Sequence, residues 1–166
     1  VRPNAIPKEA VVRIGFQIMI AVRTMHFFRD AGLGPAAMIV SRLVRHLYGS
    51  DIHWDARIEP GVQIVHGMGL AISPRACVGK DVILFQNVIL GEGTHPTTRA
   101  SGAPNVGRGV HIGSGATLLG PIEIGEGTKI MAGCVLRDSV PADSLVVAPQ
   151  PEVRACVAPR VRRSGT

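Results

Sequence analysis

The 166-residue sequence is poor in aromatic side chains, because Phe, Tyr and Trp together make up only 4% of it. Apolar residues nevertheless reach 46%, so aliphatic side chains must fill the interior, which favours a regular, narrow core. The shortage of rings argues against nucleic-acid binding, since single strands are bound on aromatic platforms and no recognised nucleic-acid module is present. The net charge of +6 remains compatible with a small anionic cofactor such as a nucleotide or coenzyme A.

Cysteine is also scarce, with Cys77, Cys134 and Cys156 as the three in the chain. An odd number without metal-type spacing argues against a disulfide framework or a zinc site, so we interpret them as reduced packing residues. Long apolar runs are missing as well. The longest one near the start, IGFQIMIAV, falls short of the roughly 20 residues that cross a bilayer. No secretory signal is visible, and we expect a cytoplasmic protein.

What the sequence does contain is a repeat with a period of six. In residues 105–136, aliphatic side chains recur at Val106, Ile112, Leu118, Ile124, Ile130 and Leu136. The register extends backwards through Ile52, Ile58, Ile64 and Leu70, then, after a two-residue slip, through Val78, Leu84 and Leu90. A helix places residues six apart on opposite faces and a strand alternates with period two. Neither period explains the pattern.

A chain that runs straight for a few residues, turns at a Gly-containing corner and repeats can stack each side on its predecessor. This arrangement is a parallel β-helix, one of the architectures associated with hexapeptide repeats. Three sides per turn make a coil of about 18 residues, and roughly thirteen repeats give four to five coils. A sandwich of short strands with coincidental spacing is the weaker alternative.

The repeats divide the chain into three predicted parts: a helical segment over 1–50, a β-helix domain over 51–148 and a basic tail over 149–166. Two helices are expected at 8–29 and 35–48, with Pro35 suited to a first turn. They either pack against each other or a subunit, or lie on a membrane surface, which we consider the less favoured possibility. Residues 92–105 break the repeat and predict a projecting loop, where a binding site is expected.

Among the six histidines, His66 stands out because it lies in a Gly-rich irregularity, HGMG, close to the slip in register. His26 and His46 fall in the predicted helices, while His53 and His111 lie between inward-facing aliphatic positions. A zinc hydratase on the same coil would need three converging histidines. Beyond His66 and His111 no third histidine occupies a matching repeat position, so we expect no metal.

Residues 48–147 resemble the catalytic region of serine O-acetyltransferases and of their shorter polysaccharide-modifying relatives. The resemblance is carried by Asp51-Ile52-His53, by His66 fifteen residues after Asp51, and by QNVILG over 86–91. It implies a left-handed parallel β-helix, a homotrimer, and transfer of an acetyl group from acetyl-CoA to an alcohol. His66 would be the general base, since a neutral imidazole suits this role near neutral pH. Asp51 would orient its ring.

The resemblance also places coenzyme A in a groove between stacked coils, against small residues and backbone groups. The matching positions are Gly91, Ser114, Ala132 and Gly133, with Lys129 available to the phosphates. Small residues at corners are also what the coil itself requires, so each position alone is a weak indicator.

Three acceptor-binding positions of the family are not matched. Serine acetyltransferases have an aspartate before the catalytic histidine, where this chain has Val65. They also have an Arg-His pair before a proline, where this chain has Gly102 and Ala103 before Pro104. A zwitterion left without charged partners binds poorly. We therefore predict an acceptor other than L-serine, such as a sugar hydroxyl or another small molecule.

Substitute contacts to such an acceptor could come from the projecting loop, through His95, Thr97 and Arg99. Two alternatives remain open at this point. One is a serine O-acetyltransferase with an altered acceptor pocket, and the other is a noncatalytic β-helix scaffold. The second is disfavoured because a scaffold has no use for both Asp51 and His66.

Overall fold

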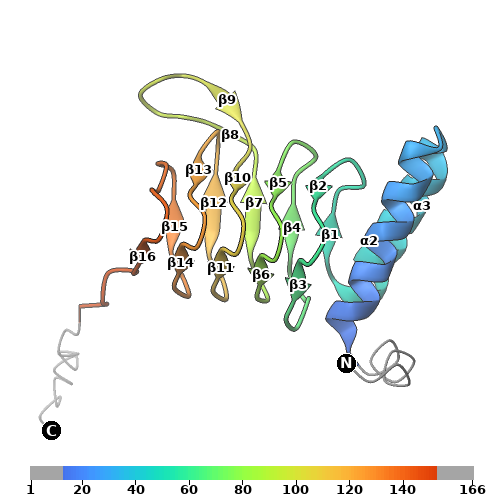
Figure 1. Cartoon of the computed structure of the whole chain (residues 1–166), viewed down its shortest axis with the longest axis horizontal. Coiled ribbons are helices and arrows are strands. Elements are labelled where there is room, and N and C mark those ends of the chain that lie inside the picture. Colours follow the sequence, from blue (N-terminus) through green and yellow to red (C-terminus); the bar gives the residue numbers. More distant parts are fainter. Residues whose placement is uncertain (1–12, 153–166) are drawn as a thin grey trace, which may run out of the picture.

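The computed structural model describes residues 13–152, which form two α-helices followed by a stack of short parallel strands (Figure 1). Helix α2 spans Ile14–Asp30 and helix α3 spans Gly34–Tyr48. Both predicted helices are present, and three of their four ends lie within a residue of the prediction, but α2 begins at Ile14 and Arg13 before it is extended. Residues 8–12 of the first predicted helix, and most of the predicted tail, lie outside the described residues. Helix α3 is capped by Gly49, whose φ of 63° is the left-handed conformation that glycine adopts freely.

The strands stack into three parallel sheets, one on each side of the coil. The first sheet contains β1 (Asp51–Ile52), β4 (Ala71–Ile72), β7 (Ile89–Gly91), β12 (Thr117–Leu119) and β15 (Val135–Leu136). The second contains β2 (Arg57–Ile58), β5 (Cys77–Val78), β10 (Asn105–Val106) and β13 (Glu123–Ile124). The third contains β3 (Gln63–Ile64), β6 (Ile83–Leu84), β11 (His111–Ile112), β14 (Lys129–Ile130) and β16 (Leu145–Val146). This architecture confirms the predicted parallel β-helix.

The strand register gives the length of each coil. Ala71 pairs with Ile89, and Thr117 pairs with Val135, so these coils take the predicted 18 residues. Gln63 pairs with Ile83, which is 20 residues further on. Since the next coil from Ala71 is regular, the two extra residues lie between Gln63 and Ala71. This segment contains His66.

The position of the slip in the repeat therefore differs from the prediction. We placed it after Leu70, with Leu70 as the inward strand residue. In the structure the extra residues come before Leu70, which occupies the corner position, and Ile72 is the inward residue that pairs with Ile52 and Leu90. Both Leu70 and Ile72 are buried. Two strongly apolar positions, two residues apart, were available, and hydrophobicity alone could not distinguish them.

A second, longer insertion produces the projecting loop. Ile89 pairs with Thr117, 28 residues further on. The ten additional residues form an antiparallel hairpin of β8 (Gly93–Thr94) and β9 (Ser101–Gly102), which extends from the coil in Figure 1. The predicted loop is thus confirmed, although its last residue, Asn105, already belongs to β10.

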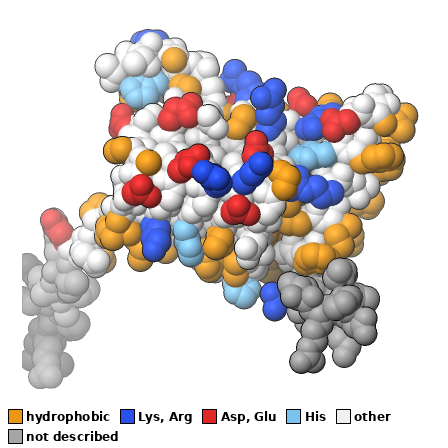
Figure 2. Space-filling model, viewed as in Figure 1, with side chains coloured by type: hydrophobic (Ala, Val, Ile, Leu, Met, Phe, Trp, Pro, Cys, Tyr) orange, Lys and Arg blue, Asp and Glu red, His pale blue; other side chains and the backbone are white. Residues whose placement is uncertain are grey.

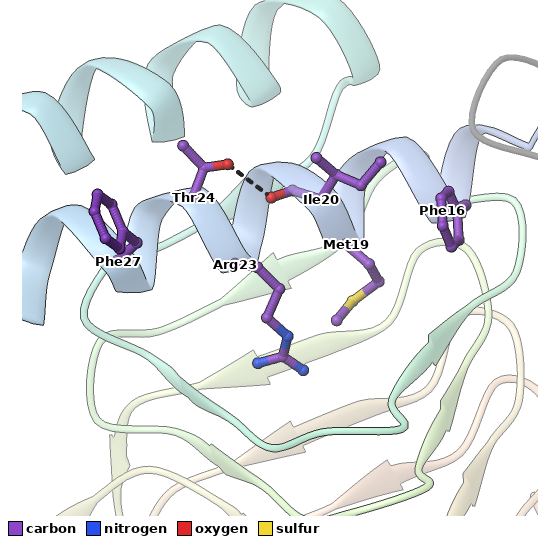
Figure 3. Close-up of a pocket in the computed structure, with 6 residues that line it drawn as sticks. All are labelled: Phe16, Met19, Ile20, Arg23, Thr24 and Phe27. Atoms are coloured by element: carbon purple, nitrogen blue, oxygen red, sulfur yellow. Dashed lines mark hydrogen bonds between the residues drawn. The ribbon is translucent and has the colours of Figure 1, made fainter. Parts of the chain in front are cut away.

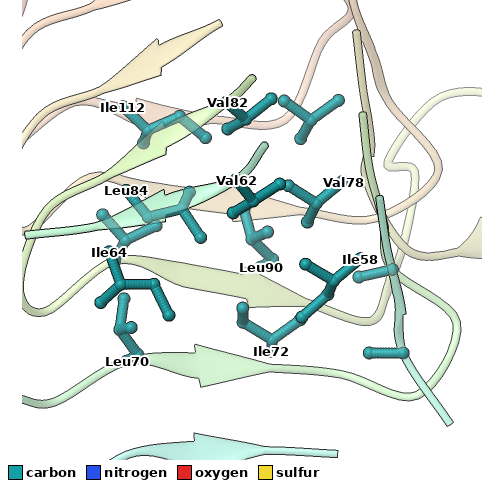
Figure 4. Close-up of a cluster of buried hydrophobic side chains, with 14 of the residues drawn as sticks. Ile58, Val62, Ile64, Leu70, Ile72, Val78, Val82, Leu84, Leu90 and Ile112 are labelled. Carbon is teal, nitrogen blue, oxygen red and sulfur yellow. The ribbon is translucent and has the colours of Figure 1, made fainter. Parts of the chain in front are cut away.

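The core is a column of aliphatic side chains that runs along the axis of the coil (Figure 4). The second residue of nearly every strand in the three sheets points inward, and those from Ile52 to Ile130 are buried. Leu136, near the open end of the stack, is only partly buried. Each fully buried aliphatic side chain stabilises the fold by about 1.5–3 kcal/mol, so the six-residue repeat provides the main stabilisation of the stack.

The two helices close the first coil. Gly15 of α2 lies against β3, where a Cβ would come within 1.8 Å of the Ile64 carbonyl oxygen. Arg23 donates hydrogen bonds to the carbonyl oxygens of Ile58 and Glu59 at 2.5 and 2.6 Å. These bonds satisfy acceptors on the exposed end of the stack, which would otherwise be an open edge. No helix within residues 13–152 is long and apolar enough to cross a membrane.

The outer surface of the helices remains strongly apolar. Figure 2 shows hydrophobic side chains gathered over the helical end, whereas charges of both signs are interspersed over the coil. A shallow cavity of about 470 Å³ lies along α2 (Figure 3). It is lined by Phe16, Met19, Ile20, Arg23, Thr24 and Phe27.

Candidate active site

His66 lies in the two-residue insertion that follows β3. Its φ of 62° is unusual for a residue other than glycine, and such strained conformations concentrate at functional sites. The turn is held by the preceding coil, because the Ser50 hydroxyl donates a hydrogen bond to the Gly67 carbonyl oxygen. A Cβ at Gly67 would lie 2.2 Å from Cδ1 of Ile18. The insertion therefore packs closely against α2 while the His66 side chain is exposed.

The corner that carries His66 is continued by Gln86 and Asn87 in the next coil and by small residues in the two coils after it. The Asn87 N–H donates to the Met68 carbonyl, and one coil on the Gly115 N–H donates to the Gln86 carbonyl. The next step is the bond from the Gly133 N–H to the Ser114 carbonyl. This ladder places Ser114, Ala132 and Gly133 on the same corner as His66.

Neighbouring coils are about 4.8 Å apart, so the predicted base and three predicted cofactor residues lie along one edge. Ala132 and Gly133 are exposed and Ser114 is half-buried. Asn87 of the next coil lies between His66 and these three residues on the ladder.

Asp51 begins β1 and points outward, toward helix α3. Its Oδ1 accepts a hydrogen bond from Nη2 of Arg45 at 2.5 Å. Within residues 13–152 no hydrogen bond joins the Asp51 carboxylate to the His66 ring, and their predicted pairing stays a prediction. The sequence reasoning missed Arg45, because its approach to Asp51 depends on the angle at which α3 enters the coil.

A groove of about 220 Å³ lies over the start of the first sheet and brings Asp51 together with Gly91, the predicted cofactor residue. We call it the Arg45 groove. It is lined by Arg45, Asp51, His53, Ala71, Ile72, Ser73, Pro74, Ile89, Leu90 and Gly91. The Ser73 hydroxyl is buried without a hydrogen-bond partner. An unsatisfied buried hydroxyl beside a groove indicates a place where a bound polar group would be stabilised.

Lys129 begins β14 on the third sheet and is exposed. It pairs in register with His111, whose ring stacks on Phe85 with 5.1 Å between centroids. The lysine thus lies three residues before Ala132, on the sheet that leads into the His66 corner. This position is compatible with a contact to a phosphate group.

The projecting loop holds the other predicted acceptor contacts. Nε2 of His95 lies 3.3 Å from Oδ1 of Asp138, and its Nδ1 accepts the N–H groups of Thr97 and Thr98. Arg99 has a φ of 60° and an exposed side chain. The loop therefore folds around His95, and Arg99 is displayed to solvent.

A smaller cavity of about 140 Å³ lies beneath the loop, and it contains two charged residues that sequence reasoning missed, Glu92 and Arg137. Glu92 is already paired with Arg75 at 2.8 Å. Gly102, one of the unmatched family positions, packs so tightly that a Cβ would lie 2.7 Å from Cβ of Pro121. A bulky side chain therefore does not fit at position 102 along this path of the loop.

Within the described part of the chain, no group of three or more His, Cys, Asp or Glu side chains is arranged to hold a metal ion. Cys77 is partly buried and Cys134 is buried, and both are free thiols. Cys156 lies outside the described residues.

The stacked sheets and the six-residue period give the chain the architecture of a hexapeptide-repeat protein. Residues 103–138 match the family described as bacterial transferase hexapeptide (six repeats). The chain is 38% identical over 135 residues to a serine acetyltransferase of Synechococcus elongatus, covering 80% of this chain and 54% of that protein. It therefore spans about half the length of the curated relatives that it matches.

Solved structures give the same result. A Neisseria gonorrhoeae serine acetyltransferase in complex with serine superposes with a TM-score of 0.76 at 31% identity, covering 86% of this chain and 58% of that one. A Brucella abortus serine acetyltransferase in complex with coenzyme A gives a TM-score of 0.72 at 30% identity, over 81% of this chain and 54% of that one. The predicted resemblance to serine O-acetyltransferases is confirmed.

These relatives overturn the prediction that the acceptor is an alcohol other than L-serine. That prediction was wrong because it treated the side chains at Val65, Gly102 and Ala103 as the sole possible partners for a zwitterion. The fold also brings together charged groups from different elements, such as Arg45 beside Asp51. A comparison of single sequence positions does not detect such groups. The relatives favour the alternative that we left open, a serine O-acetyltransferase with an altered acceptor pocket.

Proposed function

We propose that this chain carries the acetyltransferase site of a serine O-acetyltransferase, which moves an acetyl group from acetyl-CoA to the hydroxyl of L-serine. The observation that carries the proposal is the exposed His66, held in a strained insertion at the corner that Ser114 and Ala132 continue. Similarity over 80% of the chain to a serine acetyltransferase supports the choice of acceptor.

In the proposed reaction, His66 is the general base. The serine oxygen attacks the thioester carbonyl carbon as its proton passes to the imidazole. The tetrahedral intermediate then collapses, the carbon–sulfur bond breaks, and the imidazolium returns the proton to the departing CoA sulfur. Asp51 orients the ring and stabilises the imidazolium, as carboxylates do for histidine bases in other acyl-transfer sites.

The donor is proposed to lie along the His66 corner. Its pantetheine arm would contact Ser114, Ala132 and Gly133, where small side chains leave backbone groups accessible. Gly91 would contribute from the Arg45 groove. Lys129 would pair with a phosphate, as an exposed ammonium on the adjoining sheet. His95 and Arg99 remain proposed acceptor contacts from the loop.

The hand of the coil and its assembly are also proposals. We propose a left-handed β-helix, supported by TM-scores of 0.72–0.76 with serine acetyltransferase structures. We propose a homotrimer because apolar side chains such as Val135 and Met131 are 64% and 50% exposed on the coil, and such surfaces favour association. The proposed division into 1–50, 51–148 and 149–166 is supported by the end of α3 at Tyr48 and of β16 at Val146.

An acceptor panel tests the function. The full chain is incubated with acetyl-CoA and, separately, L-serine, homoserine, monosaccharides or nucleotide sugars, while CoA thiol release is measured and products are identified by mass spectrometry. We expect O-acetylserine to form with the highest kcat/KM. Acetylation of a sugar without O-acetylserine would refute the assignment, and no transfer to any acceptor would favour a noncatalytic scaffold.

A further inference from the structure

We infer that Arg45 binds the carboxylate of the acceptor and thereby sets the specificity of this chain for an amino acid. The inference rests on the proposed function and adds the group that recognises the charged end of L-serine. It answers the question raised by Val65, Gly102 and Ala103, none of which can pair with a charge.

The first argument is the place of Arg45 in the fold. It lies in the last turn of α3 and lines the Arg45 groove with Asp51, the proposed partner of the general base. Asp51 and His53 are the other ionisable side chains that line this groove. His53 stacks on Trp54 and its Nδ1 accepts the Asp55 N–H. Arg45 is therefore the permanent cation nearest to the proposed catalytic carboxylate among the residues lining the groove.

The second argument is the unused capacity of the guanidinium. Its Nη2 donates to Asp51 Oδ1, whereas Nε and Nη1 have no hydrogen-bond partner in the described part of the chain. Arginine presents five N–H donors in a planar fork that matches a carboxylate. One guanidinium can therefore keep its bond to Asp51 and bind a second carboxylate at its free donors.

The third argument is that the pair is open to a ligand. The side chains of Arg45 and Asp51 are 56% and 52% exposed, and exposed ion pairs contribute little to stability. A substrate carboxylate can therefore approach the guanidinium from solvent, and any small shift of the pair on binding costs little. By contrast, Arg23 of α2 is held between two backbone carbonyls and is not available in this way.

The fourth argument is the shape and lining of the groove. Its volume of about 220 Å³ is well above the 10–15 Å³ that one water needs, and the groove is open to solvent. The unpartnered Ser73 hydroxyl supplies a second polar group on the floor. Ala71 and Ile89 keep the remaining outer surface of the sheet uncharged.

Kinetics with a matched acceptor pair test the inference. L-Serine is compared with ethanolamine, which has the same hydroxyl and amine but no carboxylate. In Arg45→Met we expect the KM for L-serine to rise about 10- to 100-fold, as for loss of a charged hydrogen bond. The KM for acetyl-CoA should change much less, because Gly91 is the one proposed donor contact that lines the groove. The ratio of kcat/KM for L-serine to that for ethanolamine should fall by a similar factor.

Arg42→Met is the matched control, because Arg42 is an exposed arginine on the same helix that does not line the groove. We expect its acceptor ratio to equal that of the wild type. Arg45→Lys keeps the charge but loses the fork, so its ratio should lie between those of the wild type and Arg45→Met.

An acceptor ratio in Arg45→Met equal to that of the wild type would overturn the inference, even if the overall rate fell. If the acceptor ratio fell further in Arg137→Met than in Arg45→Met, the inference would also be overturned. The carboxylate would then be assigned to the cavity beneath the loop. If Arg45→Met is folded but inactive with both acceptors, calorimetric titration decides, since undiminished L-serine affinity excludes the role. If the wild-type chain does not acetylate L-serine, the proposed function itself is refuted, independently of the role of Arg45.

Discussion

Substitution of Leu118 by alanine tests whether the six-residue period describes the core. Leu118 is 0% exposed and lies in β12, between Leu90 of the preceding coil and Leu136 of the following one. Stacked coils on both sides limit collapse into the space left by the side chain. We therefore expect a loss in the upper part of the range of about 2–5 kcal/mol seen for Leu→Ala in cores.

Urea denaturation followed by circular dichroism measures this loss, at one protein concentration because subunit association shifts the apparent stability. Leu136→Ala should cost less, since Leu136 is only partly buried near the open end. Thr117→Ala, one residue away and pointing outward, is the control and should change the free energy of unfolding by no more than about 0.5 kcal/mol. Equal losses in Leu118→Ala and Thr117→Ala would refute the inward register.

Two further predictions concern the helical cap. Gly15→Ala should lower the free energy of unfolding by about 1–3 kcal/mol, because its Cβ would overlap the Ile64 carbonyl oxygen. Gly34→Ala is the control and should leave the free energy of unfolding unchanged, because no atom lies closer than 3.9 Å to the added Cβ. Equal effects in the two variants would contradict the docking of α2. Burial, followed by the charge of Arg29, lowers the pKa of His26 from its ordinary value of 6.5. The unfolded chain then binds the proton more readily, so stability should fall as pH drops through 6.5 and below. His26→Gln should show a smaller fall in chemical denaturation at pH 7.5 and 5.5, and an unchanged pH dependence would exclude this role.

The fold was largely predictable because one physical constraint repeats along the chain. Each coil must bury one side chain per side, so residues such as Ile112 and Ile124 indicate both the architecture and the register. The two interruptions were visible as breaks in this pattern. The first was placed too late because Leu70 and Ile72 are both apolar, and only strand pairing shows that Ile72 is the one in the sheet.

The site was predictable where one residue carries the chemistry and unpredictable where groups from different elements meet. His66 was indicated by its place in an irregular, Gly-rich turn, and its positive φ is consistent with that reading. Arg45 carries no sequence signal of its own, because it is one of two arginines on an amphipathic helix. Its meeting with Asp51 depends on how α3 docks onto the first strand.

The error over the acceptor has the same origin. Three missing polar side chains were interpreted as a missing amino-acid site, although charge complementarity requires only that suitable groups lie nearby in space. Gly102 faces Pro121 at a distance that leaves no room for a large side chain. The acceptor contact that the family places at this position must therefore come from another residue in this chain.

The role of His66 as general base is tested most directly by the turnover number of His66→Asn, measured with acetyl-CoA and saturating L-serine and compared with that of the wild type. Asparagine keeps a polar side chain of similar size but cannot accept the serine proton, so kcat should fall by about 10²- to 10⁴-fold with the KM for acetyl-CoA unchanged. His46→Asn, a change at an exposed histidine of α3, should retain full activity. A His66→Asn enzyme that turns over within about twofold of the wild type would contradict the assignment of this corner as the catalytic centre.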